Sequence, residues 1–557
     1  MTLQICVAQL NFVVGDMAGN ARKIIDCARE AYARGARLVL TPELSICGYA
    51  AEDLFLRPAF IDACDDALKT IAIELAGLKG LHVVVGHPEG GGLRTRSVAV
   101  TRRHNRASVL SEGQIVAHYD KRELPNYQVF DERRYFTPGE GVGVFEVAGV
   151  RVGLLICEDA WFEEPARLAA DAGAQVLAVL NASPFHAGKS AEREQRMRER
   201  VQDTGLPLVY AHLVGGQDEV IFEGRSFALD DAGGVVARAE GFREAALDMQ
   251  VTLAGARAVL TAKSEAVQPL PTPEAELWDA LVLGVRDYLG KNGFKGAILG
   301  LSGGIDSALV LAIAVDAIGA EKIHAVMMPS PYTADISWID SRDMVKRLGV
   351  RYDEIAIAPL FEGFRTALAG QFAGLAEDTT EENIQARIRG TLLMALSNKT
   401  GAIVLTTGNK SEMATGYCTL YGDMAGGFAV IKDVLKTKVF ALARWRNQND
   451  PYGTGSNPIP ERIITRPPSA ELRPDQKDQD SLPEYEVLDA IIERYMENDE
   501  GMAALVADGF EPADVEKVTR LIKLNEYKRR QSPVGIRVTH RSFGKDWRYP
   551  MTNRFRA

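Results

Sequence analysis

Three polar residues stand where short apolar runs end, and their side chains could together hydrolyse an amide. They are Glu43, Lys121 and Cys157. A thiolate attacks carbonyl carbons, a carboxylate can take the thiol proton and later activate water, and an ammonium can stabilise the oxyanion that forms. Because α/β folds place their chemistry at strand ends, these residues predict amide hydrolysis through a thioester.

Each residue taken singly has a plainer interpretation, since a cysteine after an apolar strand is usually a core residue and a single charge is usually solvated. Their surroundings are more specific. The strings TPELSICGY, YDKRELPNYQVFDERRYF and LLICEDAWF resemble the three signatures of the nitrilase, or carbon–nitrogen hydrolase, superfamily, in that family's order. The resemblance covers about residues 1–260. It implies a four-layer αββα sandwich in which Glu43, Lys121 and Cys157 are catalytic.

Further strings in the same region resemble the glutaminase branch of this superfamily. LPNYQVF, NASPF and FHAGKSAER imply that Tyr127, Ser183 and Lys189 bind L-glutamine. Some relatives carry Arg at the last of these positions. Residues 214–224, VGGQDEVIFEG, also resemble this branch and are expected to line the glutamine pocket.

A second constellation is a glycine loop, SGGIDS at residues 302–307, between an apolar run and an apolar helical stretch. It lacks a Gly-Lys-Ser/Thr ending and so is not a Walker A loop. Glycines let backbone N–H groups approach phosphate oxygens, and a helix N-terminus favours anions. A tight structural turn is the alternative for a bare Gly-Gly pair. We expect phosphate binding here, with Asp306 as a Mg²⁺ ligand, because hard cations take carboxylate oxygens beside phosphates.

The whole string SGGIDS resembles the pyrophosphate-binding loop of the N-type ATP pyrophosphatases, which adenylate a carboxylate or carbonyl oxygen. Two later strings resemble the NAD synthetase branch: TTEENIQARIRG (379–390), expected to precede a helix, and AIVLTTGNKSEMATGYC (402–418). The resemblance covers nearly all of residues 275–550. It implies that ATP is bound by Gly300, Leu301, Ser302, Gly303, Gly304, Ile305, Asp306, Ser307 and Thr407.

The same resemblance implies the remaining ligands of the second site. Asn383, Glu412 and Lys528 are expected to bind deamido-NAD, Glu412 is expected to join Asp306 at the metal, and Arg387 is a further candidate contact. Composition alone would place Lys528 on a solvated helix face. Residues 328–341, MPSPYTADISWIDS, differ from the more Ser-rich sequence expected there, so no adenine ligand is assigned.

Together the two halves imply an enzyme that amidates deamido-NAD to NAD with ammonia from L-glutamine, using ATP and Mg²⁺. At neutral pH free ammonia is mostly ammonium, which is not nucleophilic, so we expect an internal channel to carry it. One alternative is an amidotransferase that adenylates a different acid, which the dinucleotide strings disfavour. Another is a catalytically idle scaffold, which the complete motifs disfavour.

The elements that must position these residues alternate in both halves. The first 260 residues alternate apolar runs with amphipathic helical stretches, the pattern of an α/β domain. Residues 268–273, which contain three prolines, read as a linker, and a helix should begin near Glu274. The second half predicts a doubly wound parallel sheet, like that of the adenine nucleotide alpha hydrolases. Its expected strands are Ala297–Leu301, Ile323–Met328, Asp353–Ile357 and Ala402–Thr406.

We therefore expect a carbon–nitrogen hydrolase domain over residues 1–262, a linker over 263–275 and an NAD synthetase domain over 276–557. Residues 451–484 carry many prolines and charges with little periodicity. Such a long loop predicts a mobile lid, with a solvated surface insertion as the alternative.

Composition narrows the partners and the compartment. The net charge of -11 argues against a nucleic-acid partner, which usually needs a basic face. Six cysteines in 557 residues are too few for a disulfide scaffold and fit a reducing cytosol. With no leader peptide and no long apolar run, we expect a cytoplasmic protein without a membrane span. The resemblance further implies a symmetric homo-oligomer, in many relatives an octamer.

Overall fold

The computed structural model describes residues 2–89, 103–255, 257–263, 267–469, 471–473, 480 and 482–554. The chain divides into two compact units. Unit 1 comprises Met1–Gln217 and Ile221–Pro271, and unit 2 comprises Asp218–Val220 and Thr272–Ala557. Each unit is described below by itself. Among the described residues, no helix is long and apolar enough to cross a membrane.

Unit 1 contains two mixed sheets. The first has seven strands in the order β15 (Arg257–Ala262), β14 (Ala245–Ala254), β1 (Thr2–Gln9), β2 (Leu38–Leu40), β3 (His82–Pro88), β4 (Asn105–Ser111) and β5 (Gln114–Asp120). The second has six, in the order β13 (Val235–Arg238), β12 (Phe227–Leu229), β9 (Leu208–His212), β8 (Val176–Asn181), β7 (Val150–Ile156) and β6 (Gly143–Val147). Strands β1 to β3 and β7 to β9 are parallel, and the outer strands pair antiparallel. A separate hairpin joins β10 (Val214–Gln217) and β11 (Val220–Glu223).

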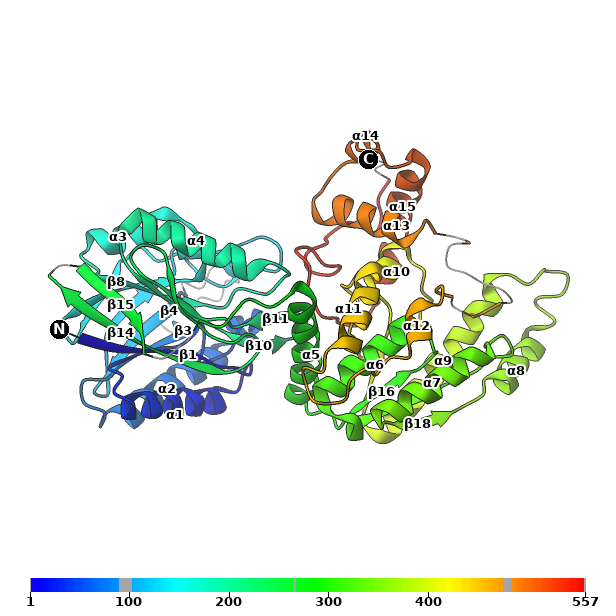
Figure 1. Cartoon of the computed structure of the whole chain (residues 1–557), viewed down its shortest axis with the longest axis horizontal. Coiled ribbons are helices and arrows are strands. Elements are labelled where there is room, and N and C mark those ends of the chain that lie inside the picture. Colours follow the sequence, from blue (N-terminus) through cyan, green and yellow to red (C-terminus); the bar gives the residue numbers. More distant parts are fainter. Residues whose placement is uncertain are drawn as a thin grey trace. The chain divides into compact units, whose positions relative to one another are not determined.

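The core of unit 1 lies between these sheets because alternate strand residues point into one shared layer. Leu3, Ile5 and Val7 of β1 belong to the same buried cluster as Val152 and Ile156 of β7. Helices cover the outer faces: α1 (Met17–Ala33) and α2 (Pro58–Leu75) on one side, α3 (Glu163–Asp171) and α4 (Lys189–Thr204) on the other (Figure 1). The predicted four-layer αββα sandwich is confirmed.

Unit 2 is built on a five-stranded parallel sheet. Its order is β18 (Arg351–Glu354), β17 (Ile323–Met327), β16 (Ala297–Gly300), β19 (Ile403–Thr406) and β20 (Phe428–Ala429). Helix α6 (Ile305–Ile318) packs on β16 and β17, and α9 (Thr379–Thr400) packs on β16 and β19. Ile298 of β16 and Val404 of β19 share a buried cluster with Ile384 and Ile388 of α9. The predicted doubly wound sheet is confirmed, and its order reverses at β16, where such folds bind ligands.

The other helices of unit 2 surround this sheet or extend beyond it. They are α5 (Pro273–Lys291), α7 (Asp335–Leu348), α8 (Ala358–Leu368), α10 (Lys410–Thr415), α11 (Lys436–Gln448), α12 (Glu461–Thr465), α13 (Tyr485–Ile492), α14 (Met502–Ala507), α15 (Pro512–Leu524) and α16 (Glu526–Arg529). A second buried cluster joins α10, α13 and α15 and includes Trp547 near the C-terminal end. Helix α10, which follows β19, therefore packs against α13 and α15.

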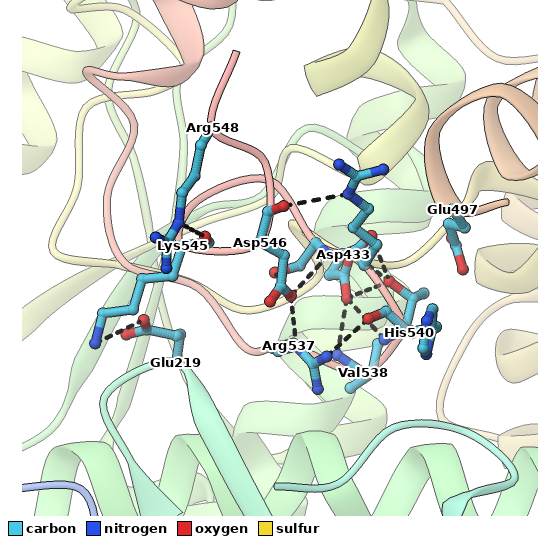
Figure 2. A network of polar contacts seen from close by, with 12 residues as sticks. Glu219, Asp433, Glu497, Arg537, Val538, His540, Lys545, Asp546 and Arg548 are labelled. Atoms are coloured by element: carbon cyan, nitrogen blue, oxygen red, sulfur yellow. Dashed lines mark hydrogen bonds and ion pairs between the residues drawn. The ribbon is translucent and has the colours of Figure 1, made fainter. Parts of the chain in front are cut away.

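A polar network fixes the segment after α16 against the start of α10. Arg537 donates to Asp546 over 2.6 Å, and the backbone N–H of Val538 donates to Asp433 over 2.8 Å (Figure 2). The buried ammonium of Lys410, at the start of α10, lies 3.0 Å from the same Asp433 carboxylate and 2.6 Å from Glu497. Because a buried charge is tolerated only when it is paired, the network specifies where the C-terminal segment lies.

Three expectations about local structure need correction. The strand expected at Asp353–Ile357 is β18 at Arg351–Glu354, because Ile357 turns inward to begin α8 instead. The string at residues 379–390 does not precede a helix but forms the first half of α9, started by a capping box of Asp378 and Glu381. The stretch 451–484 is not wholly irregular, since it contains α12, and residues 470, 474–479 and 481 of it lie outside the described residues.

Candidate active sites

Cys157 directly follows β7 and opens a short 3₁₀ turn, η3 (Cys157–Trp161). Its backbone φ is +48°, in the left-handed region that a residue with a Cβ seldom adopts. Such strained positions occur at functional sites, where the surrounding structure holds them. The side chain is buried, with 2% of the residue exposed. The strand end thus aims a thiol at one fixed point inside unit 1.

Lys121 directly follows β5 and is fully buried between two carboxylates. Its Nζ lies 2.7 Å from Oε1 of Glu43 and 2.8 Å from Oε1 of Glu132. Glu43 also accepts hydrogen bonds from Nδ2 of Asn105 at 2.7 Å and from the backbone N–H of Ala182 at 3.1 Å. With its oxygens held from two sheets, the Glu43 carboxylate has one fixed orientation.

Electrostatics sets the protonation of these groups. Burial raises the pKa of the Cys157 thiol well above its ordinary value, Glu43 raises it further, and Lys121 opposes both. Burial by itself lowers the pKa of Lys121, but Glu132 and Glu43 outweigh it and hold that pKa well above its ordinary value. The resting pair is therefore a neutral thiol beside a charged ammonium, so attack requires a base to take the thiol proton.

Glu132 is a site residue that the sequence reasoning missed. It lies in η2 (Glu132–Arg134) within the string YDKRELPNYQVFDERRYF, among charged neighbours that make it look solvated. It is 4% exposed, accepts a hydrogen bond from the hydroxyl of Tyr49 at 2.9 Å, and has a pKa that burial raises to about 7 while Lys121 opposes the shift. No pattern in the string singled it out, because its role depends on packing against Lys121.

Asp159, also missed, joins the loop of Lys121 to the turn of Cys157. Its carboxylate accepts hydrogen bonds from the backbone N–H groups of Arg122, Glu123 and Ile156 at 3.0, 2.8 and 3.0 Å, and from the hydroxyl of Tyr119 at 3.0 Å. Arg122 follows Lys121 and Ile156 precedes Cys157, so one carboxylate fixes both backbones. Asp159 is fully buried, and burial raises its pKa to about 6 against these bonds.

Two of the three residues expected to bind glutamine, Tyr127 and Lys189, contact the turn that Cys157 opens. The hydroxyl of Tyr127 donates to Glu158 at 2.9 Å, and the Lys189 ammonium lies 4.0 Å above the ring of Trp161 and interacts electrostatically with Glu158. Ser183 accepts a hydrogen bond from Arg193 at 3.3 Å. Glu158, which burial gives a raised pKa, is a third residue that the sequence reasoning did not single out.

Residues 214–224 form the hairpin of β10 and β11. Glu223, at the end of β11, accepts hydrogen bonds from Arg193 at 2.5 Å and Ser190 at 3.2 Å. Arg193 in turn donates to Ser183, so the string expected near the pocket is linked to a predicted glutamine ligand through one buried arginine. The tip, Asp218–Val220, belongs to unit 2.

In unit 2 a cavity of about 270 Å³ lies at the ends of β16 and β19. Apart from Gly303, every residue predicted to bind ATP lines it, as does Glu412: Gly300, Leu301, Ser302, Gly304, Ile305, Asp306, Ser307 and Thr407. Gly303 has φ +79°, and a Cβ there would lie 2.7 Å from the carbonyl oxygen of Ser337. Only glycine fits this turn, which leads into the N-terminus of α6.

Two carboxylates and a lysine form one charged side of this cavity, whose lining also includes Arg389, Asp423 and Glu471. The Lys436 ammonium pairs with Asp306 and lies 3.7 Å from Oε1 of Glu412, while Nδ2 of Asn409 donates to Asp306 at 2.9 Å. Within the described ranges no group of three or more His, Cys, Asp or Glu side chains is placed to hold a metal. Mg²⁺ beside phosphates needs only one or two carboxylates, so Asp306 and Glu412 fit it. Lys436, 2% exposed at its side chain, was not anticipated.

Apart from Glu412, the residues expected to bind the dinucleotide lie beside the cavity and do not line it. Asn383 accepts a hydrogen bond from the hydroxyl of Thr419 at 2.8 Å, and Lys528 donates to the carbonyls of Gly416 and Cys418 at 2.8 Å each. Arg387 donates to the carbonyl of Leu420 at 3.2 Å. All three thus contact residues 416–420, and Thr419 of that segment lines the cavity.

Comparison with known proteins gives one family match in each half of the chain. The family model for carbon–nitrogen hydrolase matches residues 4–259, and that for NAD synthase matches residues 277–532. The chain is 48% identical to the glutamine-dependent NAD(+) synthetase of Xanthomonas campestris, covering 99% of this chain and 98% of the relative. It is 45% identical to that of Acinetobacter baylyi, with coverage of 100% and 99%.

Among solved structures, the chain is similar to the glutamine-dependent NAD+ synthetase of Acinetobacter baumannii in complex with ADP. The sequence identity is 42%, the TM-score is 0.78, and 99% of each chain is covered. With two successive family matches, full-length identity above two fifths, and both predicted folds in place, this chain belongs to the glutamine-dependent NAD(+) synthetases.

Proposed function

We propose that this chain hydrolyses L-glutamine in unit 1 and uses the ammonia in unit 2 to amidate ATP-activated deamido-NAD, the final step of NAD biosynthesis. The observation that carries the first half-reaction is the fully buried Lys121 ammonium, bonded to Glu43 and Glu132 and electrostatically coupled to Cys157. A lysine whose ammonium is held in this way stabilises negative charge and does not act as a base.

In unit 1, Glu43 takes the thiol proton of Cys157 as sulfur attacks the side-chain amide carbon of glutamine. Lys121 stabilises the oxyanion, and the proton on Glu43 passes to the leaving nitrogen, which departs as ammonia. Glu43 then activates a water molecule that hydrolyses the thioester to glutamate. Tyr127, Ser183 and Lys189 are proposed to hold the amino-acid end of the substrate.

In unit 2, the backbone of residues 302–307 and the Ser302 and Ser307 hydroxyls hold the phosphates of ATP at the start of α6. Asp306 and Glu412 would hold Mg²⁺, which would neutralise phosphate charge when bound. The nicotinate carboxylate of deamido-NAD attacks the α-phosphorus and releases pyrophosphate, and ammonia then displaces AMP to give NAD. Asn383, Glu412 and Lys528 are proposed to orient the dinucleotide.

We also propose that ammonia passes between the two reactions inside protein and that the chain acts in the cytoplasm as a homo-oligomer. Protonation in bulk water would inactivate ammonia as a nucleophile, which is the physical reason for a channel. Isotope competition tests it: with ¹⁵N-labelled glutamine and excess unlabelled ammonium, channelled transfer gives labelled NAD. Extensive dilution of the label would contradict a channel.

The decisive test of the function is mass detection of NAD formed from deamido-NAD, ATP, Mg²⁺ and glutamine. Omission of either ATP or deamido-NAD should abolish product formation. The second candidate function is amidation of another acid. The same assay tests it when nicotinate mononucleotide, aspartate or citrulline replaces deamido-NAD. Faster turnover of any of these than of deamido-NAD would reject the proposed acceptor.

A further inference from the structure

Arg389, on α9, lines the cavity at the ends of β16 and β19, but the proposed reaction gives it no role. Its Nε donates to the backbone carbonyl of Met328, the residue after β17, at 3.0 Å. Among the described residues this is the one hydrogen bond of the guanidinium, which has five N–H donors. The side chain is thus held at the carboxyl end of the sheet with donors left for a ligand.

No carboxylate in the described part of the chain forms an ion pair with Arg389, although several line the cavity. Asp306 pairs with Lys436 instead. Asp423 accepts a hydrogen bond from a backbone N–H at 2.6 Å, and Glu471 accepts one from a serine hydroxyl at 2.6 Å. Lys436 and Arg389 are the two cations of the described cavity lining, so Arg389 is the one whose charge an anionic ligand can neutralise.

An apolar part of the cavity lies beside this arginine. A Cβ added to Gly300, the last residue of β16, would lie 3.2 Å from the side chain of Met328 and 3.5 Å from that of Leu393. Leu393 is four residues after Arg389 on α9, so the two side chains share one face of that helix. These residues all line the cavity. Such an apolar wall suits the adenine ring of ATP.

The glycine loop is linked to the same stretch of α9. One turn before the arginine, the side-chain amide of Gln385 donates to the carbonyl of Leu472 at 3.1 Å. The neighbouring Glu471 accepts its hydrogen bond from Ser337, whose carbonyl oxygen would lie 2.7 Å from a Cβ on Gly303. The arginine therefore lies between the apolar wall and the loop proposed to hold phosphates. In ATP, the α-phosphate is the group that joins the nucleoside to the two outer phosphates.

We propose that Arg389 binds the α-phosphate of ATP and stabilises the charge that develops there during adenylation, which rests on the function proposed above. In that step a carboxylate oxygen of the acid forms a bond to the α-phosphorus. The bond from this phosphorus to the bridging oxygen breaks, and pyrophosphate leaves with the electron pair. Two anions must approach each other, and a guanidinium bonded to the phosphate oxygens reduces their repulsion.

The electrostatics of the empty cavity agrees with this role. Burial lowers the pKa of Arg389 to about 10, and Glu471 and Asp423 only partly oppose this shift. The guanidinium still stays charged at neutral pH. Its desolvation costs free energy that no paired carboxylate offsets, so an anionic ligand gains more here than at a cation that is already paired.

The test is titration of the full chain with adenosine, AMP and pyrophosphate, each with Mg²⁺. Arg389→Gln should weaken AMP binding about tenfold or more, because only AMP carries the α-phosphate beside the base. Binding of adenosine and of pyrophosphate should change less than about twofold. Equal weakening of adenosine and AMP would make Arg389 a structural residue, and weakening of pyrophosphate alone would place it at the outer phosphates. Either result, or no AMP binding to the unmodified chain, would overturn the proposal.

Matched variants and kinetics complete the test. Arg389→Lys should restore part of the AMP affinity, since it keeps the charge but not the planar fork. Lys399→Gln, at an exposed cation in the last turn of the same helix, should change nothing. In Arg389→Gln, kcat for NAD formation should fall about a hundredfold or more with little change in KM for deamido-NAD. An unchanged kcat would reject the catalytic role.

Stability separates this role from a structural one. Because Arg389 has no carboxylate partner among the described residues, Arg389→Gln should not lower Tm of the unliganded chain, and the rise in Tm on adding AMP should shrink. Should this variant unfold instead, the comparison of AMP with adenosine is made on Arg389→Lys. The binding arms use neither glutamine nor deamido-NAD. AMP binding through Arg389 without NAD formation would therefore reject the proposed acceptor and not the phosphate contact.

Discussion

The two candidate active sites are prepared for their substrates to different degrees. In unit 1 the charged groups already contact one another: Lys121 is bonded to Glu43 and Glu132, and all three are buried. In unit 2 the reacting region is a cavity whose charged side, Asp306 with Lys436, pairs internally. Under the proposed function, the first site would need only the substrate amide, whereas the second would have to exchange its internal ion pair for phosphate and metal.

This difference follows from what each site must stabilise. Amide hydrolysis develops one small oxyanion, whose charge a single buried ammonium can stabilise without rearrangement. Adenylate formation handles a triphosphate with several charges, which require many backbone N–H groups and a cation. In the proposed assignment, the glycine loop after β16 would supply the N–H groups and Asp306 would bind the cation. Breaking one site should therefore leave the other working when its substrate is supplied directly.

The largest expected effect is at the nucleophile. Cys157→Ala should lower glutamine-driven NAD formation by at least about a thousandfold, because no other thiol can form the thioester. Synthesis from added ammonium should persist near the original rate. Both rates are measured by NAD mass detection on the same preparation. Equal loss of the two activities would mean that the sites are not separable.

Lys121→Met should come next, lowering glutamine-driven synthesis by about a hundredfold to a thousandfold. It leaves Glu43 and Glu132 buried together without their cation, so the free energy of unfolding should also fall by about 3–5 kcal/mol. Glutaminase kinetics and thermal unfolding of the variant check both. Lys69→Met, at a lysine exposed on the surface of the same unit, is the control and should change neither.

Gly303→Ala tests the second site. The added Cβ would lie 2.7 Å from the Ser337 carbonyl oxygen, and the backbone φ of +79° is strained for alanine. NAD synthesis should therefore fall about tenfold or more with either nitrogen source. Gly349→Ala is the matched control, since its φ is +68° with no neighbour within 4 Å. Glutaminase activity without ATP should be retained in both variants. A selective loss of glutamine-driven synthesis in Gly303→Ala would contradict the assignment of the loop.

Asp159→Asn should have a moderate effect on unit 1 alone. The amide keeps one acceptor oxygen, so part of the three-bond link between the backbones next to Lys121 and Cys157 is lost and the two side chains are held less closely in position. We expect kcat for glutamine hydrolysis to fall about tenfold to a hundredfold with little change in KM. An unchanged kcat in a folded variant would assign Asp159 to stability only.

The smallest effect concerns pH. Burial raises the folded-state pKa of Glu132 to about 7 from an unfolded value near 4.5, so the folded chain binds more protons between these pH values. Its contribution to stability is therefore present below about pH 4.5 and declines as pH rises to about 7. In Glu132→Gln this decline should disappear, so Tm of the wild type minus Tm of the variant should fall from pH 5 to pH 7.5. A constant difference would argue that Glu132 stays ionised throughout.

The sequence predicted the parts of both sites that are adjacent to regular elements. Cys157 directly follows β7, Lys121 directly follows β5, and SGGIDS follows β16 after one intervening residue, so all three stand at strand ends. The α/β class of both units was likewise predictable, because the alternation of strands and helices is local, whereas the four layers of unit 1 were implied by the family resemblance. The boundaries of β18 and of α9 were not, since Ile357 looked like a strand residue and the Asp378 cap was overlooked.

The residues that were missed share one property. Glu132, Glu158, Asp159 and Lys436 are charged residues, and only tertiary packing shows that they are buried. Glu132 is 11 positions from Lys121, and Lys436 is 130 positions from Asp306, so no short string contains the second pair. Pairing between charges from distant segments is a property of the fold and not of any local pattern.

The left-handed backbone of Cys157 has an evolutionary consequence. A residue held at φ +48° costs about 1–3 kcal/mol, and glycine would relieve that strain. Selection for thermal stability alone should therefore enrich glycine at position 157 and yield more stable variants that no longer hydrolyse glutamine. Directed evolution of this chain must select for glutamine turnover together with melting temperature, because stability and activity favour different residues at this position.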